Sequence, residues 1–564
     1  MDGKYGGSWR DGDRGLARAT EIPTEFATAG TFHGEIHNTL GWDAKYEEMQ
    51  ITLTVGCLSG SKFCRNLLYD DILLKPTNGS TDFSGQDEDP QHHQYTTTWQ
   101  PSEVVEEIKQ LYAIALPLII TGLLFYGKAV ISMLFMGRLG KEVLAGGSLS
   151  IGFANITGYS ILTGLAMGME AISSQAYGAK QWILMGHALQ CTVVILIAAS
   201  LPISFLWLNV EPILIYCGQD PSIASIASTY LTFSLPDLLF QSFINPLKIY
   251  LRSQNITQPL IHSAAFALAL HAPINYFLVY HLGLGLRGIS IAAALTDLNL
   301  LTFLFLYLYI SGIHKKSWQG WSLECFREWR PIMSLAIPSC ISVCLEWWWY
   351  ELMIVFSGLL VDAAEAVASM GILIQTTSLV YIFPSALSLA VSTRVGNELG
   401  ANRPDRARVS TQVALACAVF TGLIAMSFTT TLRDTWGRAF TKDKAILSLT
   451  AMAMPVVGLC ELGNCPQTTG CGVLRGSARP SLGANINLGS FYGVGMPIAV
   501  IMGFVLDMGF MGLWLGLLAA QATCALVMTF ILLGTDWGLE AKRARQLTGT
   551  NAAVVEGEEE EEEP

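Results

Sequence analysis

Twelve long apolar stretches, more than any single motif, constrain what this chain can fold into. An α-helix rises 1.5 Å per residue, so about 20 consecutive apolar residues cross the hydrocarbon core of a bilayer. Of the 564 residues, 14% are charged and 51% are hydrophobic, whereas roughly 25% of the residues of a soluble protein are charged. We therefore predict an all-α membrane protein whose twelve transmembrane helices lie at about residues 111–135, 143–168, 187–208, 223–245, 260–280, 286–311, 331–356, 366–391, 409–431, 446–470, 482–505 and 509–534.

Four sequence markers recur in the second half of the chain at a nearly constant separation of 222 to 224 residues. The pairs are Gly178 and Gly400, Arg252 and Arg475, Pro273 and Pro497, and Gly288 and Gly512. Because each half has an even number of crossings, the halves are parallel repeats related by an axis along the membrane normal. We expect two six-helix lobes around a central cavity that opens to either side by rocking, which is the architecture of a carrier.

The distribution of charge predicts the topology. Basic residues are more than twice as frequent in the loops on the side of the N-terminus as in those on the other side, which places both termini in the cytosol. A run of like charges repels itself and stays solvated, so we expect the glutamates at 558–563 to be disordered. The predicted parts are a disordered cytosolic N-terminal extension (1–105), a first lobe (106–313), a cytosolic inter-lobe loop (314–330), a second lobe (331–535) and a cytosolic acidic tail (536–564).

Composition and motifs also exclude several classes of function. The net charge of -12 does not suit a nucleic-acid partner. The 12 cysteines lack a zinc-site spacing, and there is no phosphate-binding Gly-Lys-Ser/Thr loop of an ATP-driven pump. We find no constellation of catalytic groups, so we expect no enzyme activity, no metal and no cofactor.

Four short segments, at 175–179, 338–351, 392–401 and 472–476, carry a family resemblance. The second contains Leu-Glu-Trp-Trp, and the third reads Ser-Thr-Arg-Val-Gly-Asn-Glu-Leu-Gly-Ala. With them the chain resembles the multidrug and toxic compound extrusion (MATE) family, and within it the plant detoxification branch, over about residues 105–540. The resemblance implies the MATE-type two-lobe fold and a proton-coupled antiporter that exports organic solutes or xenobiotics from the cytosol by alternating access. The alternative is a lipid-linked saccharide flippase of related architecture.

Glu346 is the leading candidate for proton coupling, because it lies about 15 residues past Pro331, well inside an apolar run. A charge near the bilayer centre costs on the order of 2.5–3.5 kcal/mol, and desolvation favours the protonated carboxyl. A carboxyl that is protonated facing one side and ionised facing the other couples proton movement to transport. The alternative is a structural glutamate satisfied by hydroxyl or indole N–H groups. Glu351, about 140° further around the helix, is expected to be a structural partner.

The tenth predicted helix departs from the plant branch. The resemblance places an aspartate eleven residues before Arg475, but this chain has Asn464 there, and an amide cannot release a proton. Glu461, three residues earlier on nearly the same helix face, could supply the missing carboxyl. The alternative is that Glu346 works alone beside the polar side chains of Asn464, Gln467 and Thr468.

The first lobe offers different candidates. Bacterial and archaeal relatives often carry an aspartate in helix one, whereas this chain has Lys128 there, which favours coupling in the second lobe. Lys128 has four open roles: attracting an anionic solute, neutralising an acid across the cavity, snorkelling to the membrane surface, or pairing with Asp237. We expect the remaining polar cavity lining to come from Tyr126, Asn155, Gln375 and Tyr381, although an amide in a membrane helix often bridges two helices instead. The expected partners are a small organic solute, protons and lipid, and we expect a monomer in the plasma membrane or in the vacuolar, Golgi or endosomal membrane.

Overall fold

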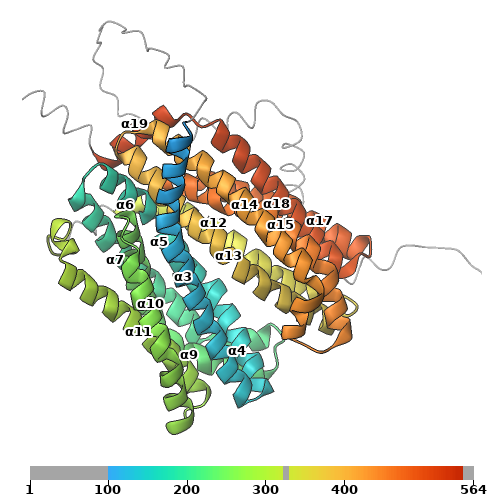
Figure 1. Cartoon of the computed structure of the whole chain (residues 1–564). Coiled ribbons are helices and arrows are strands. Elements are labelled where there is room, and N and C mark those ends of the chain that lie inside the picture. Colours follow the sequence, from blue (N-terminus) through green and yellow to red (C-terminus); the bar gives the residue numbers. More distant parts are fainter. Residues whose placement is uncertain (1–99, 322–328, 550–564) are drawn as a thin grey trace, which may run out of the picture. The chain divides into compact units, whose positions relative to one another are not determined.

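The computed structural model describes residues 100–321 and 329–549. Most of the predicted N-terminal extension and the glutamate run at 558–563 lie outside the described residues. Within the described part, twelve helices are long and apolar enough to cross a membrane, which confirms the predicted count. Figure 1 shows them as two bundles, one in blue to green and one in yellow to red.

The first lobe contains six crossings, one of them built from several helical pieces. They are α3 (Pro101–Leu139); α4 (Lys141–Ala154), η1 (Asn155–Tyr159), α5 (Ser160–Ala166) and α6 (Met169–Gly178); α7 (Trp182–Leu208); α9 (Pro221–Ser253); α10 (Gln258–Tyr276) with η2 (Phe277–His281); and α11 (Leu286–Ser311). The short α8 (Val210–Tyr216) and η3 (Ile313–Lys316) lie in connections.

The second lobe repeats this plan, here with a segmented fifth crossing. Its crossings are α12 (Trp329–Ser357); α13 (Ala363–Gly400); α14 (Pro404–Trp436) with η5 (Gly437–Ala439); α15 (Lys444–Gly476); α16 (Pro480–Asn487), η6 (Leu488–Gly495), α17 (Met496–Val500) and η7 (Ile501–Val505); and α18 (Gly509–Leu533). A final helix, α19 (Trp537–Thr548), follows.

Matching helix caps support the internal repeat. The carboxylate of Asp220 accepts a hydrogen bond from the backbone N–H of Ser222 at the start of α9, and Asp443 accepts one from Ala445 at the start of α15, both at 2.8 Å. A side-chain oxygen at this position satisfies a backbone N–H that has no partner within the helix. The two aspartates are separated by 223 residues, so the repeat includes the starts of the fourth and tenth crossings.

Several helices extend well beyond their apolar runs. Helix α3 begins at Pro101, ten residues before the predicted start, and α13 continues to Gly400, nine residues past its predicted end. Basic residues beyond the predicted runs therefore lie within helices, among them Lys248, Arg252, Arg394 and Arg475. Hydropathy missed these extensions because they carry polar side chains: Arg394 and Glu398 of α13 are covered by protein, whereas most side chains at the start of α3 are exposed.

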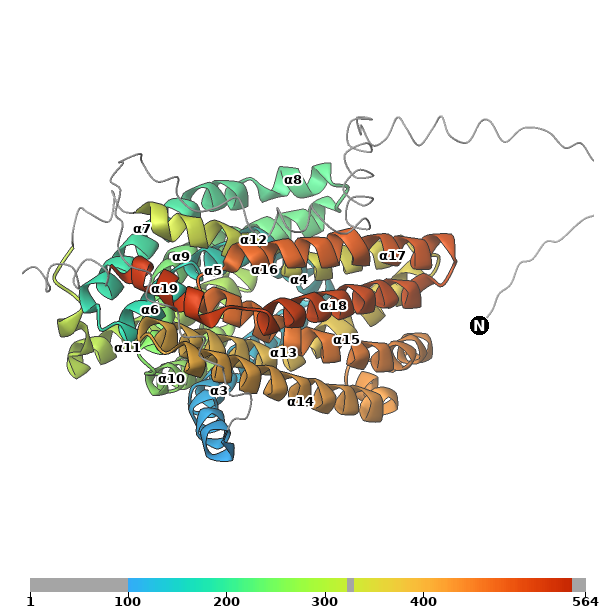
Figure 2. The same ribbon diagram turned by 90° about the horizontal axis from the view of Figure 1, so that it is seen from above.

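Helix α19 occupies the first part of the segment predicted as an acidic tail. Its buried face includes Trp537, Ala541 and Ala544, and this face packs against α6, α13 and α14. Glu540 accepts a hydrogen bond from Arg543 at 2.8 Å and lies 3.4 Å from Arg479. Figure 2 shows α19 beside α6 at one end of the bundles.

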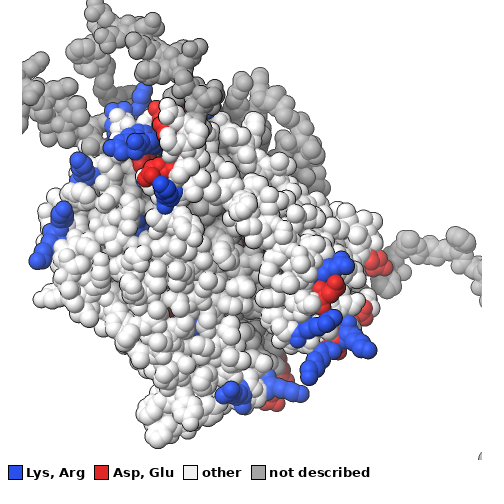
Figure 3. Space-filling model, in the orientation of Figure 1, with Lys and Arg blue, Asp and Glu red and all other residues white. Residues whose placement is uncertain are grey.

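The surface agrees with a membrane setting. On the face drawn in Figure 3, the coloured Lys, Arg, Asp and Glu residues gather near the two ends, and a broad uncharged band separates them. Many large hydrophobic side chains are exposed, including Phe205, Phe420 and Phe530 at 72%, 65% and 80%. Such exposure suits contact with lipid tails.

Candidate functional site

Two acidic side chains are buried inside the second lobe, Glu346 of α12 at 7% exposure and Glu461 of α15 at 1%. Among the described residues, neither lies within 4.0 Å of a basic group. The side-chain amide of Asn464 donates to the Glu461 carboxylate at 2.9 Å. Gln467 and Tyr381 interact with the carboxyl of Glu346. Both acids are therefore bordered by neutral polar groups.

Further hydrogen bonds tie this group together. The Oδ1 atom of Asn464 accepts from the hydroxyl of Thr468 at 3.2 Å and from the side-chain amide of Gln521, on α18, at 3.4 Å. Gln467 donates to Asn487 of α16 at 3.5 Å. We refer to the six residues Glu346, Tyr381, Glu461, Asn464, Gln467 and Thr468 as the second-lobe cluster. It unites both proton-coupling candidates and four of the eight predicted cavity residues.

A cavity of about 470 Å³ lies in the first lobe. Every residue that lines it belongs to this lobe except Leu389 of α13. Two of the predicted cavity residues, Lys128 and Asn155, are on its wall, whereas Tyr126 and Gln375 are not among the lining residues. The structure thus divides six of the eight predicted lining residues between a first-lobe cavity and a buried second-lobe cluster, and Tyr126 and Gln375 belong to neither.

Lys128 neutralises an acid of the cavity wall, and this acid is Asp297 and not Asp237. Its ammonium lies 2.7 Å from the carboxylate of Asp297 on α11, and the amide of Gln241 donates to the same carboxylate oxygen at 3.1 Å. Asp237 instead accepts a hydrogen bond from the hydroxyl of Tyr159 at 2.6 Å. Asp297 was overlooked, although its position inside the predicted run 286–311 carries the same energetic signal as that of Glu346.

We expect the Lys128–Asp297 pair to contribute strongly to stability. Lys128→Met leaves the carboxylate of Asp297, which is 2% exposed, without its cation, and such a loss costs about 3 kcal/mol. The unfolding temperature of the purified protein in detergent should fall clearly below that of the wild type. The double variant Lys128→Met/Asp297→Asn, which removes both charges, should recover most of the loss. Equal unfolding temperatures for Lys128→Met and the wild type would contradict this assignment.

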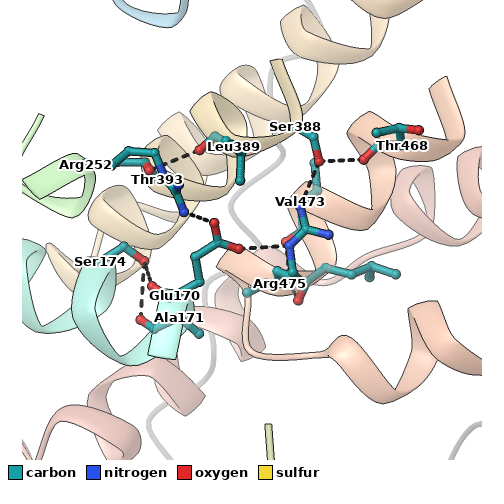
Figure 4. Close-up of polar contacts among 12 residues, drawn as sticks. Glu170, Ala171, Ser174, Arg252, Ser388, Leu389, Thr393, Thr468, Val473 and Arg475 are labelled. Atoms are coloured by element: carbon teal, nitrogen blue, oxygen red, sulfur yellow. Dashed lines mark hydrogen bonds and ion pairs between the residues drawn. The ribbon is translucent and has the colours of Figure 1, made fainter. Parts of the chain in front are cut away.

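At one end of the molecule the two lobes meet around the carboxylate of Glu170 of α6. This residue is 2% exposed. Its carboxylate binds Arg252 of α9 in its own lobe and accepts a hydrogen bond from Arg475 of α15 at 2.8 Å (Figure 4). Arg252 and Arg475 are related by the repeat, so two equivalent arginines share a single carboxylate. We refer to these three residues as the closing cluster and to this end of the lobes as the closed end.

Close backbone contacts surround the closing cluster. A Cβ atom at Gly178 would overlap with the carbonyl oxygen of Asn397, and one at Gly400 would overlap with that of Gln175. The side-chain amide of Gln175 also donates to the carbonyl oxygen of Gly476 at 2.9 Å. The strings at 175–179, 392–401 and 472–476 therefore bring α6, α13 and α15 into direct contact.

A short polar chain connects the closing cluster with the second-lobe cluster. Arg475 donates to the hydroxyl of Ser388 at 2.9 Å, and this hydroxyl donates to the carbonyl oxygen of Thr468 at 2.6 Å (Figure 4). Thr468 in turn bonds Asn464, the partner of Glu461. The acid of α15 and the contact between the lobes thus belong to one connected set of hydrogen bonds.

Another ion pair fixes the start of α3 to the second lobe. Arg394 of α13 lies 2.8 Å from Glu107 of α3 and 2.8 Å from Glu398. Glu107 also accepts a hydrogen bond from Ser410 of α14 at 2.6 Å.

Within the described residues there is no group of three His, Cys, Asp or Glu side chains that could hold a metal ion.

Comparison with known proteins gives a consistent picture. A family model described as MatE matches residues 117–277 and 338–501. The chain is 58% identical to Protein DETOXIFICATION 48 of Arabidopsis thaliana over 79% of this chain and 84% of that protein. It is also 58% identical to Protein DETOXIFICATION 49 of Arabidopsis thaliana, over 79% of this chain and 89% of that protein.

Solved structures share the fold. The crystal structure of the eukaryotic MATE transporter AtDTX14 aligns with a TM-score of 0.77 and 30% identity, over 79% of this chain and all of that chain. The Vibrio cholerae MATE transporter VcmN in the bent form aligns with a TM-score of 0.68 and 15% identity, over 79% of this chain and 99% of that chain. At that identity the second likeness concerns the fold alone.

Proposed function

The chain belongs to the MatE family and is a secondary active efflux transporter of small organic solutes, and from this premise we propose that it exchanges protons for the solute it exports. We assign the proton to the two acids of the second-lobe cluster, Glu346 and Glu461. Glu461 would then supply the carboxyl that the plant branch usually carries at the position of Asn464.

The observation that carries this proposal is that neither acid forms an ion pair within the described residues, although Arg475 acts on Glu346 from beyond contact distance. Among the described residues both acids lie near amides and hydroxyls and have no cation within 4.0 Å. An amide can donate to an ionised carboxylate and, after rotation, accept from a protonated one. Asn464 and Gln467 can therefore satisfy either protonation state, whereas a fixed ion pair would hold an acid in its charged form.

We assign the closed end to the cytosolic side, with both chain termini on that side, because the loops at this end carry most of the basic residues. In this conformation the solute would be released on the opposite side of the membrane. The polar chain from Glu461 through Thr468 and Ser388 to Arg475 supports a link between protonation and the closing of the lobes. We place the transporter, as a monomer, in the plasma membrane or an endomembrane.

Reconstitution tests proton exchange directly. Purified protein in liposomes should accumulate a fluorescent organic solute only under an imposed pH gradient, and a protonophore should abolish accumulation. Equal accumulation with and without the gradient would contradict proton exchange.

The same assay tests the role of Glu461. Glu461→Gln should lower the initial rate of gradient-driven transport by roughly tenfold or more, because removal of a proton-transferring group commonly has effects of 10² or larger. The double variant Glu461→Gln/Asn464→Asp should recover much of the rate, since it returns a carboxyl one helical turn away. Glu365→Gln, on the exposed start of α13, is the matched control. Wild-type transport by Glu461→Gln would show that Glu346 works alone.

A further inference from the structure

The first-lobe cavity is large enough for an organic solute but lies apart from the second-lobe cluster. Its volume of about 470 Å³ falls within the range of roughly 300–1,000 Å³ that is usual for small-molecule sites. Its five charged lining residues come from α3, α9 and α11, and they are Lys128, Asp237, Lys248, Asp297 and Arg252 of the closing cluster. The chemistry of a solute depends on which of these charges are already matched.

Two of the cations that line this cavity are neutralised within the protein. Lys128 forms its ion pair with Asp297, at 2.7 Å. Arg252 binds the carboxylate of Glu170. Neither cation needs an anionic solute to compensate for its burial.

Lys248 differs from both of these residues. Within the described residues it has no carboxylate oxygen within 4.0 Å, and its ammonium lies over the ring of Phe125 at 4.4 Å from the ring centre. A cation–π contact stabilises an ammonium but leaves its charge in place. The cavity wall therefore carries one positive charge that no acid among the described residues contacts within 4.0 Å, and the apolar side chains of Phe125 and Ile249 also line this cavity.

The remaining acid, Asp237, is poorly placed to bind a cationic solute. One of its oxygens accepts from Tyr159 at 2.6 Å, and the other is buried without a partner among the described residues. It lies eleven residues from Lys248 along α9, which is about three helical turns, and its charge acts on Lys248 without an ion pair between them. A solute carboxylate can therefore contact the ammonium of Lys248 without contacting Asp237.

We propose that the first-lobe cavity binds an organic solute with a single carboxylate, whose charge contacts Lys248 and whose apolar or aromatic body packs on Phe125 and Ile249. A cation that contacts no carboxylate favours one negative charge on the solute, and the ring of Phe125 beside it favours an apolar or aromatic body. The proposal rests on the proposed function only in treating the bound solute as one that is transported. Binding itself needs no proton gradient, so the two can fail separately.

Equilibrium binding to the purified full-length protein in detergent tests this proposal. The probes are 2-naphthoate, 2-naphthamide and 2-(aminomethyl)naphthalene, which share one ring system and carry a negative, a neutral and a positive group. We expect naphthoate to bind roughly tenfold or more tightly than the amide, as is typical for a hydrogen bond to a charged group. Comparable binding of the amide, or tightest binding of the amine, would overturn the proposal.

Variants of Lys248 identify the contact. Lys248→Met should remove the preference for naphthoate over naphthamide and leave the affinity for naphthamide within about twofold, because it keeps an unbranched apolar stem. Lys248→Arg should retain the preference, and its folding is compared with that of Lys248→Met by thermal unfolding. Lys442→Met, at an exposed lysine outside the cavity, is the control. An unchanged preference in Lys248→Met would exclude Lys248 as the anion contact, whatever the transport assay shows.

Discussion

Replacing Glu346 by glutamine is expected to abolish solute transport driven by a pH gradient. Glutamine has nearly the same shape, but it cannot bind and release a proton. Because Glu346 is buried and forms no ion pair within the described residues, the amide can still be accommodated by Gln467 and Tyr381. We expect the initial rate in proteoliposomes to fall by roughly 10²-fold, the lower range for removal of a proton-transferring group, while the unfolding temperature stays close to that of the wild type.

The matched control for this variant is Glu351→Gln on the same helix. Glu351 faces a different direction, since its carboxylate lies 3.8 Å from the Cβ position of Gly152 on α4. Its replacement should leave the response to the gradient in place. Binding of naphthoate to the first-lobe cavity should be unchanged in both variants. Gradient-driven transport by Glu346→Gln at the wild-type rate would refute a coupling role for Glu346.

The second large effect is expected at the closing cluster, where Glu170→Gln should open the closed end. Glu170 holds Arg252 and Arg475 in a buried site, and its loss leaves two guanidinium groups without their carboxylate. Removing one partner of a buried ion pair costs about 3–5 kcal/mol. Each 1.4 kcal/mol changes an equilibrium tenfold, so the closed conformation should lose roughly 10²- to 10³-fold in population relative to open ones.

Accessibility of the closed end measures this shift. A cysteine placed at Ala401, beside the contact between Gly178 and Asn397, should react slowly with a membrane-impermeant maleimide in the wild-type background. It should react much faster in Glu170→Gln. Adding Arg475→Gln to Glu170→Gln should partly restore protection, because one unmatched charge is removed. Glu540→Gln, which breaks the peripheral ion pairs of α19, serves as the control.

Unchanged reactivity in Glu170→Gln would indicate that the backbone contacts keep the closed end shut without the ion pair. These contacts are the close approaches at Gly178 and Gly400 and the hydrogen bond from Gln175 to Gly476. The result would therefore distinguish an electrostatic closing contact from one made by packing alone.

The sequence determined the membrane architecture of this protein. Twelve apolar runs require twelve crossings, because a bilayer accepts only segments that satisfy their own backbone hydrogen bonds. The spacing of 222–224 residues predicted the two lobes, and the caps at Asp220 and Asp443 follow the same spacing. The position of Glu346 inside an apolar run marked it as a candidate, since a buried acid is costly wherever it occurs.

The tertiary structure alone decided which buried charges meet. Lys128 pairs with Asp297, 169 residues away, instead of Asp237. Two arginines related by the repeat converge on Glu170, and Lys248 remains without a carboxylate partner within the described residues. Hydropathy and helical periodicity depend on neighbours a few residues apart, whereas an ion pair depends on which helices pack together and at what depth. That information arises only when the twelve helices assemble.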